Sequence, residues 1–293
     1  MSYTNGLDKP SDYFTPHIWS GTNSNHTESI GMQPDFVWVK GRSVATDHTL
    51  FDVVRGFTVG KSLGSNTTAA EDGSNTTAYG GIGGVTSDGF TVTAGSSNAD
   101  YVNTSGRTYA SWNWKAGTSF TNDASGTGIG SIDSTGSASD VSGFSIVSFT
   151  GTGSNGTIKH GLSTKPSMVI IKRRDSANDW RVGSDGLTNW TKHVNLNTEA
   201  AQSDLASAFN STAPTSSVFS VGTSISVNAS GGTYIAYCFA SINGYSKIGG
   251  SYVGNGSTNG SYIHLGFSPA FIMVKRTDNS SGSRWLMLDN KRN

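Results

Sequence analysis

Cysteine, charge and long apolar runs are scarce in this 293-residue sequence, and each scarcity excludes a class of protein. The single cysteine, Cys238, excludes an intrachain disulfide framework and argues against a structural zinc site. Charged residues make up 14% of the chain and the formal net charge is zero, so we expect no nucleic-acid partner. No apolar run has the roughly 18 residues that a spanning helix needs, and no secretory signal opens the chain, so we expect cytoplasmic synthesis without membrane insertion.

Glutamate is also scarce, which argues against glycoside hydrolysis. The chain contains three glutamates (Glu28, Glu71 and Glu199), and most of its 17 aspartates stand beside Gly, Ser or Asn, as turn-forming residues do. A glycosidase needs a carboxylic acid with a raised pKa facing an ionised partner across a cleft, and no such pair stands out. No HExxH motif occurs either. The sequence predicts a non-enzymatic protein without a cofactor or a metal site.

One sequence pattern occurs three times, as GMQPDFVWVK at 31–40, LSTKPSMVIIK at 162–172 and LGFSPAFIMVK at 265–275. In each copy an apolar run follows a proline, and a lysine stands six residues after that proline. Proline can begin a strand but cannot continue one inside a sheet. The run is typical of a strand buried on both faces, after which we expect the lysine to return the chain to water.

Three further blocks repeat in the same order on either side of residues 118–142. They are LGSNTTAAE (63–71) and VNLNTEAAQ (194–202), SDGFTVTAG (87–95) and SSVFSVGTS (216–224), and SGRTYASWNW (105–114) and SGGTYIAYCF (230–239). Abundant Gly, Ser, Thr and Asn between apolar segments indicate short strands joined by tight turns. The sequence therefore predicts an all-β fold made of tandem antiparallel β-sandwich repeats of jelly-roll-like type.

These blocks divide the chain into five parts. Residues 1–13 are a polar N-terminal docking arm, 14–117 the first β-sandwich repeat, 143–249 the second, and 250–293 the start of an incomplete third repeat. Residues 118–142 are rich in Gly, Ser and Thr and cannot offset their ordering entropy by burial, so we expect a linker or a long surface loop there.

The third repeat lacks its closing strands. Eighteen residues follow Lys275, whereas 77 separate Lys172 from Gly249. A unit without closing strands exposes a sheet edge and an apolar face. We therefore expect either a longer polypeptide or strands supplied by another subunit.

Trp180 and Trp190 are the candidates for ligand contact, because sugars stack on exposed aromatic rings. Trp180 follows its repeat lysine by eight residues, and Trp190 lies in the polar segment GLTNWTKH. The alternative, that these rings fill or cap the sandwich core, stays open and carries more weight. His160 and His264 precede the second and third repeat prolines, where we expect hydrogen-bonded structural roles.

Several blocks together resemble a repeat family of structural proteins from tailed bacteriophages, in which such modules occur in tail fibres and other virion appendages. These blocks are DKPSDYF (8–14), GMQPDFVWVKGRS (31–43), SLGSNTTAAE (62–71), TYASWNWKAG (108–117), TYIAYCFASINGYSKIG (233–249) and GFSPAFIMVKR (266–276). The resemblance implies a virion structural protein with no catalysis of its own.

From the repeats and this resemblance we expect a homo-oligomer in the virion, held to other virion proteins by the N-terminal arm. A host cell-surface glycan is a further partner that we consider. The alternatives are a bacterial carbohydrate-binding module or adhesin and, with less support, a polysaccharide depolymerase.

Overall fold

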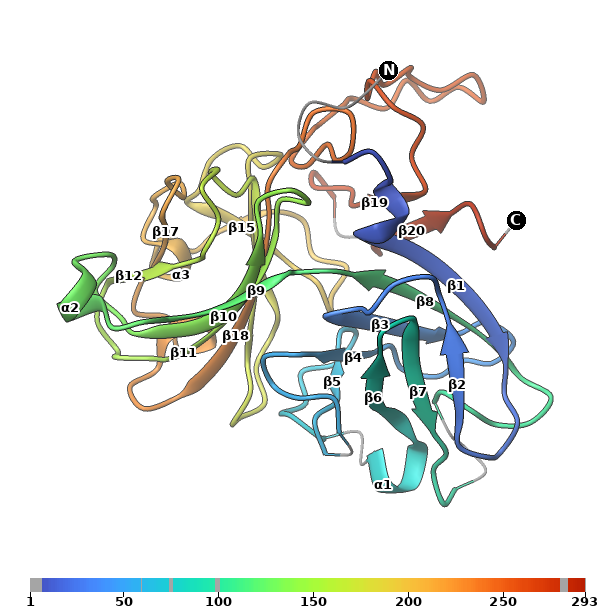
Figure 1. Cartoon of the computed structure of the whole chain (residues 1–293). Coiled ribbons are helices and arrows are strands. Elements are labelled where there is room, and N and C mark those ends of the chain that lie inside the picture. The colour runs from blue at the N-terminus through green and yellow to red at the C-terminus, as the bar shows by residue number, and fades with distance from the viewer. Residues whose placement is uncertain (1–6, 59, 74–75, 98–100, 280–283, 293) are drawn as a thin grey trace.

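A computed structural model of the chain describes residues 7–58, 60–73, 76–97, 101–279 and 284–292. The fold is all-β, and Figure 1 shows three groups of strands around a shared centre. We call residues 14–117 the first unit (blue to teal in Figure 1), 118–249 the second unit (green to orange) and 250–292 the third unit (red). No helix in the described part of the chain is long and apolar enough to cross a membrane.

The first unit pairs a five-stranded sheet with a three-stranded sheet. The larger sheet has the order β1-β8-β3-β4-β5 and the smaller has β2-β7-β6. The elements are η1 (Pro10–Asp12), β1 (Phe14–Ser20), β2 (His26–Ser29), β3 (Phe36–Gly41), β4 (Thr49–Asp52), β5 (Leu63–Gly64), α1 (Thr76–Tyr79), β6 (Gly81–Thr86), β7 (Gly89–Thr93) and β8 (Thr108–Trp114). Trp19, Phe51, Phe90 and Tyr109 belong to the apolar core between the two sheets. Strands β1, β2 and β3 alternate between the sheets, as in a jelly roll, whereas β4 and β5 stay in the sheet of β3.

The second unit repeats this strand order. Its elements after residue 142 are β11 (Phe144–Thr150), β12 (Gly156–Lys159), β13 (Met168–Arg173), β14 (Arg181–Ser184), β15 (Lys192–Asn195), β16 (Ser203–Asp204), α3 (Ala206–Phe209), β17 (Val218–Val221), α4 (Ile225–Asn228) and β18 (Thr233–Phe239). The order β11-β18-β13-β14-β15 matches β1-β8-β3-β4-β5, and β12 pairs with β17 as β2 pairs with β7. Cys238 is buried in the core between these two sheets, as the apolar neighbours of this residue predict.

The larger sheets of both units are buried on both faces, because their outer faces meet at one central core. Along β3, Val37 and Val39 point into the first unit's own core, while Phe36 and Trp38 belong to the central core. Phe144, Ile170 and Tyr237 of the second unit, among others, fill the other side of the central core. The prediction that the proline-led strand is buried on both faces is confirmed for β3 and β13, whose central residues are buried.

The third unit contributes one hairpin, β19 (Phe271–Val274) paired with β20 (Leu286–Asp289). Phe271, Met273 and Met287 of this hairpin pack against the central core. Residues 250–270 form no strand and are largely exposed.

The expected linker at 118–142 is wrong, because most of it forms a hairpin. Strands β9 (Thr118–Asn122) and β10 (Ser134–Ser139) extend the larger sheet of the second unit beyond β11, with α2 (Ala124–Thr127) at the turn between them. Asp123 caps α2 by accepting hydrogen bonds from the amides of Ser125 and Gly126. This polar segment can gain little from apolar burial. Pairing with the edge of β11 instead satisfies its backbone hydrogen bonds and orders it.

The N-terminal docking arm lies partly outside the described residues, which begin at Leu7. Leu7 is buried, and residues 10–12 form the single 3-10 turn η1. Tyr13 accepts a hydrogen bond at its carbonyl from the amide of Lys115. The described end of the arm therefore packs on its own chain.

His160 connects β12 to the loop that precedes β17. Its Nδ1 accepts a hydrogen bond from the amide of Leu162 at 3.2 Å, so Nε2 carries the proton and donates to the carbonyl of Thr215 at 3.2 Å. Burial lowers the pKa of His160 from 6.5 to about 4. The structural role expected for this histidine agrees with these contacts.

We predict that acid destabilises the fold through His160. Because the folded-state pKa lies below the unfolded one, the unfolded chain binds this proton more tightly, and stability falls as the pH drops from 6.5 towards 4. Between about pH 7 and about pH 5 the wild-type chain should lose about 2 kcal/mol more than His160→Gln, as measured by urea unfolding. Equal losses in the two chains would contradict the assignment.

Candidate functional site

Trp180 and Trp190 lie inside the molecule and present no open face to a ligand. Trp180 is fully buried in the central core, and its Nε1 donates to the carbonyl of Gly64 in the first unit at 2.8 Å. Trp190 packs edge-on against Phe209 and donates to Asp185 at 2.9 Å. Their proposed ligand-binding role is therefore corrected, and burial supports the alternative that both rings fill cores.

The repeat lysine of the second unit also binds the first unit. Lys172 is fully buried, and its Nζ donates to the carbonyl of Thr68 at 3.0 Å and to that of Asn178 at 2.7 Å. Burial lowers the pKa of Lys172 to about 8. The expectation that this lysine returns the chain to water is wrong, because two carbonyls replace its hydration inside the protein.

The third unit binds the second unit through equivalent residues. Lys275 Nζ donates to the carbonyl of Glu199 at 2.9 Å, and Trp285 Nε1 donates to the carbonyl of Asn195 at 2.9 Å. In the repeat, Glu199 corresponds to Thr68 and Asn195 to Gly64. We call these lysine and tryptophan contacts the forward contact, because the second and third units each make them with the unit before it in the sequence.

Main-chain hydrogen bonds accompany the forward contact at both boundaries. The amide of Glu71 donates to the carbonyl of Arg174 at 2.8 Å, and the amide of Gln202 donates to the carbonyl of Thr277 at 2.9 Å. These two bonds occupy equivalent places in the repeat. The same backbone geometry therefore holds at the two boundaries.

A second type of contact involves an Asp-x-x-Arg segment. It begins at the last residue of β4 in the first unit and at the last residue of the equivalent strand, β20, in the third. In the first unit Asp52 pairs with Arg55 and accepts a hydrogen bond from the hydroxyl of Tyr237 at 2.8 Å. In the third unit Asp289 pairs with Arg292 and accepts from Trp112 Nε1 at 2.9 Å. Tyr237 on β18 and Trp112 on β8 are equivalent positions, so we call this the carboxylate contact.

The two contact types together make the arrangement cyclic. The first unit makes the carboxylate contact with the second unit, and the third unit makes it with the first. Ring contacts follow the same relation, because Phe36 lies 5.9 Å from Phe144 and Phe271 lies 5.7 Å from Phe14. The third unit therefore contacts the first unit in the same way as the first unit contacts the second. All three units contribute residues to the central core, around which they are arranged (Figure 1).

Glu71 is the electrostatic centre of the boundary between the first and second units. It accepts from Arg174 at 2.9 Å and from Arg55 at 3.1 Å. Partial burial alone would raise the pKa of Glu71, but the hydrogen bonds and charges of Arg174 and Arg55 outweigh burial and lower it. The other two glutamates also have side-chain partners. Glu28 hydrogen-bonds with the ring nitrogens of His17 and His26, and Glu199 forms an ion pair with Arg284.

Two signals in the sequence mark these residues. The lysine six places after the proline marks the forward contact in the second and third units. The spacing Asp-x-x-Arg occurs at 52–55 and again at 289–292 and marks the carboxylate contact. Nothing in the spacing alone shows that such residues meet a neighbouring unit.

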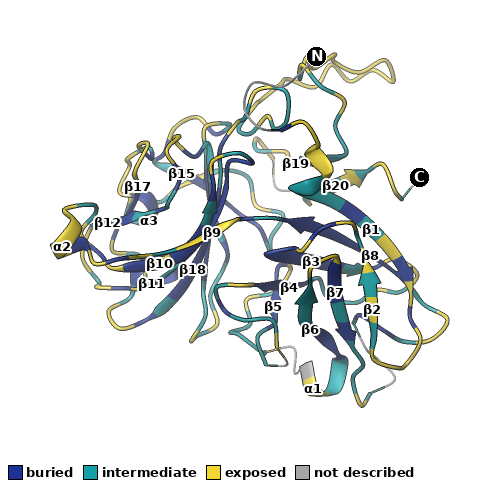
Figure 2. Ribbon diagram, viewed as in Figure 1, coloured by how far each residue is buried: buried dark blue, intermediate teal, exposed yellow. Residues whose placement is uncertain are grey.

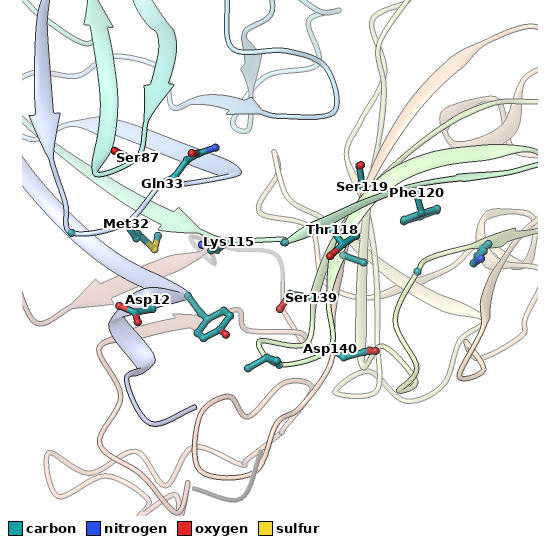
Figure 3. A pocket seen from close by; sticks show the side chains of 17 residues that line it. Asp12, Met32, Gln33, Ser87, Lys115, Thr118, Ser119, Phe120, Ser139 and Asp140 are labelled. Atoms are coloured by element: carbon teal, nitrogen blue, oxygen red, sulfur yellow. The ribbon is translucent and has the colours of Figure 1, made fainter. Parts of the chain in front are cut away.

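A cleft of about 780 Å³ lies where the first unit meets the β9–β10 hairpin (Figure 3). The residues lining it include Asp12, Met32, Gln33 and Lys115 from the first unit's side and Thr118, Phe120, Ser139, Asp140 and Lys159 from the second unit's side. Lys159 Nζ lies 5.7 Å from the centre of the Phe120 ring, within cation–π range. The cleft offers a ring beside hydroxyl, amide and charged groups, a combination that suits a polar ligand such as a sugar, and its volume lies within the roughly 300–1,000 Å³ of ligand sites.

The comparisons with known proteins give one family. A family model described as a domain of unknown function, DUF7483, matches residues 9–293. Neither a curated protein nor a solved structure matches the chain.

We predict that Glu71→Gln destabilises the protein by about 2 kcal/mol, because the neutral amide leaves the buried guanidinium of Arg55 and that of Arg174 without their shared carboxylate. Urea unfolding at neutral pH measures this change.

The matched control is Asp278→Asn, which removes the carboxylate of the exposed Arg276–Asp278 pair. That change should alter stability by less than about 0.5 kcal/mol. If the two substitutions had the same effect, Glu71 would not be the electrostatic centre of the boundary.

Proposed function

We propose that this chain, which belongs to the DUF7483 family of domains of unknown function, is a non-enzymatic structural protein of a bacteriophage virion. Within the virion it forms part of a tail fibre or another appendage and assembles as a homo-oligomer. It is made in the host cytoplasm and joins other virion proteins through its N-terminal arm. The resemblance of its repeat blocks to tailed-phage appendage proteins supports this assignment.

The observation that carries the proposal is the use of the repeat signature in contacts between units. Lys172, Trp180, Lys275 and Trp285 all bind the preceding unit instead of facing a ligand. A scaffold requires a sequence pattern that holds its units together around one core. A repeated catalytic motif would instead gather titratable groups in a cleft.

The cleft at the β9–β10 hairpin is the surface that we assign to a host cell-surface glycan. Phe120 is half-buried and has one neighbouring cation, Lys159, while Asp140 and Ser139 supply acceptors and a hydroxyl. A single weak site of this kind gains strength when repeated copies bind one surface together. The same cleft favours the second candidate function, a bacterial carbohydrate-binding module or adhesin, if the chain is not part of a particle.

Immunoelectron microscopy of purified phage particles tests the structural assignment. We expect a polyclonal antibody against the chain to label an appendage at regular positions on the particle. Competition with an excess of the purified chain should remove the label. Unlabelled particles from a lysate that contains the chain would end the virion assignment.

A glycan array tests the cleft. The wild-type chain should bind a set of surface glycans, and Phe120→Ala and Lys159→Gln should each weaken binding at least about tenfold, since the cleft loses its ring or its cation. Tyr262→Ala is the matched control, because this ring is 88% exposed and lies outside the cleft. Glycan binding that the Phe120 and Lys159 variants leave intact would place the ligand elsewhere.

A further inference from the structure

The third unit exposes apolar side chains to solvent. Tyr252, Tyr262, Ile272, Leu286 and Leu288 are 54%, 88%, 39%, 54% and 50% exposed. Figure 2 shows much of the third unit, at the top of the view, in the yellow of exposed residues. Three of them, Ile272, Leu286 and Leu288, lie on the paired strands β19 and β20. Exposed apolar residues gathered on one sheet face can mark an interaction surface.

Two of these residues, Ile272 and Leu288, occupy positions that face a sandwich core in the other units. Counted from the repeat proline, Ile272 corresponds to Val37 and Val169, which are fully buried in the cores of their own units. Leu288 precedes the aspartate of β20 as the buried Phe51 precedes that of β4. Among the described strands, the third unit therefore carries one inner face of a sandwich without an opposing sheet.

The edge of β19 is open in the part of the chain that the structure describes. Strands β3 and β13 each have a closing strand on one side, β8 and β18, and a hairpin partner on the other. Strand β19 pairs only with β20 among the described strands. His264 is exposed in keeping with this, whereas the equivalent His160 is buried against the loop before β17.

A hollow lies between the first and third units. It measures about 580 Å³ and is lined by residues 40–45 of the first unit and by Arg292 of the third. Lys40 Nζ donates within its own unit, to the carbonyl of Thr46 at 2.8 Å. The equivalent Lys172 makes the same bond to Asn178 and a second one to Thr68, in the loop after β5 of the preceding unit. A loop placed beside the third unit as the Thr68 loop is placed in the first would lie in this hollow and complete the ring.

We propose that the third unit is the docking surface for a polypeptide segment with the pattern of a closing half-repeat, such as residues 192–239. Such a segment adds a strand of the β8 and β18 type to the open edge of β19. It covers Ile272 and Leu288 with a second sheet and places a loop carbonyl against Lys40. A second copy of this chain offers no such segment, because its β15, β17 and β18 are already paired within its own second unit.

The test supplies this segment in cis. Residues 189–249 are joined after Asn293, so that they continue the register of the repeat. This full-length fusion is compared with the original chain. It is also compared with a second fusion that carries a scrambled segment of the same composition. Hydrogen exchange of the β19 amides should slow at least tenfold in the first fusion only. Binding of a hydrophobic dye should fall in parallel.

A substitution separates docking from general stabilisation. Lys40→Met should lower the melting temperature of the fusion more than that of the original chain, because only the fusion gives Lys40 a carbonyl from another unit. Unchanged exchange at β19 in the fusion would overturn the proposal. Concentration-dependent protection of β19 in the original chain, together with a dimer by light scattering, would also overturn it in favour of a second copy.

Discussion

The central core is the constraint on which the rest of the structure depends. Each large sheet must bury two faces, one against its own smaller sheet and one against the neighbouring units. Apolar residues therefore occupy successive positions of β3, β13 and β18 instead of alternating with polar ones. The aromatic residues on the outer faces, such as Phe36 and Tyr237, join two units rather than one.

Burial of so much apolar surface at one centre also determines where polar groups can go. Lys172, Trp180 and Arg55 are buried at the boundaries, and each finds a carbonyl or a carboxylate in its own or the neighbouring unit. Unpaired, such groups would cost several kcal/mol each, roughly as much as a small core truncation. The polar contacts thus set how the units are placed, while the apolar core supplies the driving force. This division of roles is the basis of the scaffold function that we propose.

The repeats, the strand-rich fold and the doubly buried strand could be predicted from sequence, because proline position, apolar runs and turn residues act locally. The hairpin at 118–142 could not, because its order depends on pairing with β11 and not on its own composition. The burial of Lys172 and of Trp180 could not be predicted from the sequence either, because both side chains bind carbonyls more than 100 residues away in the chain. The cleft at Phe120 combines residues from both units and has no sequence motif of its own.

Native-state hydrogen exchange tests the central claim most directly. If the central core couples the units, the slowest amides of β3 and of β13 should open with the same free energy. The substitution Tyr237→Phe, which removes the hydroxyl bound to Asp52, should lower both values by an equal amount, about 1 kcal/mol. Separate opening energies, with only the second unit responding to Tyr237→Phe, would show independent sandwiches and contradict the account.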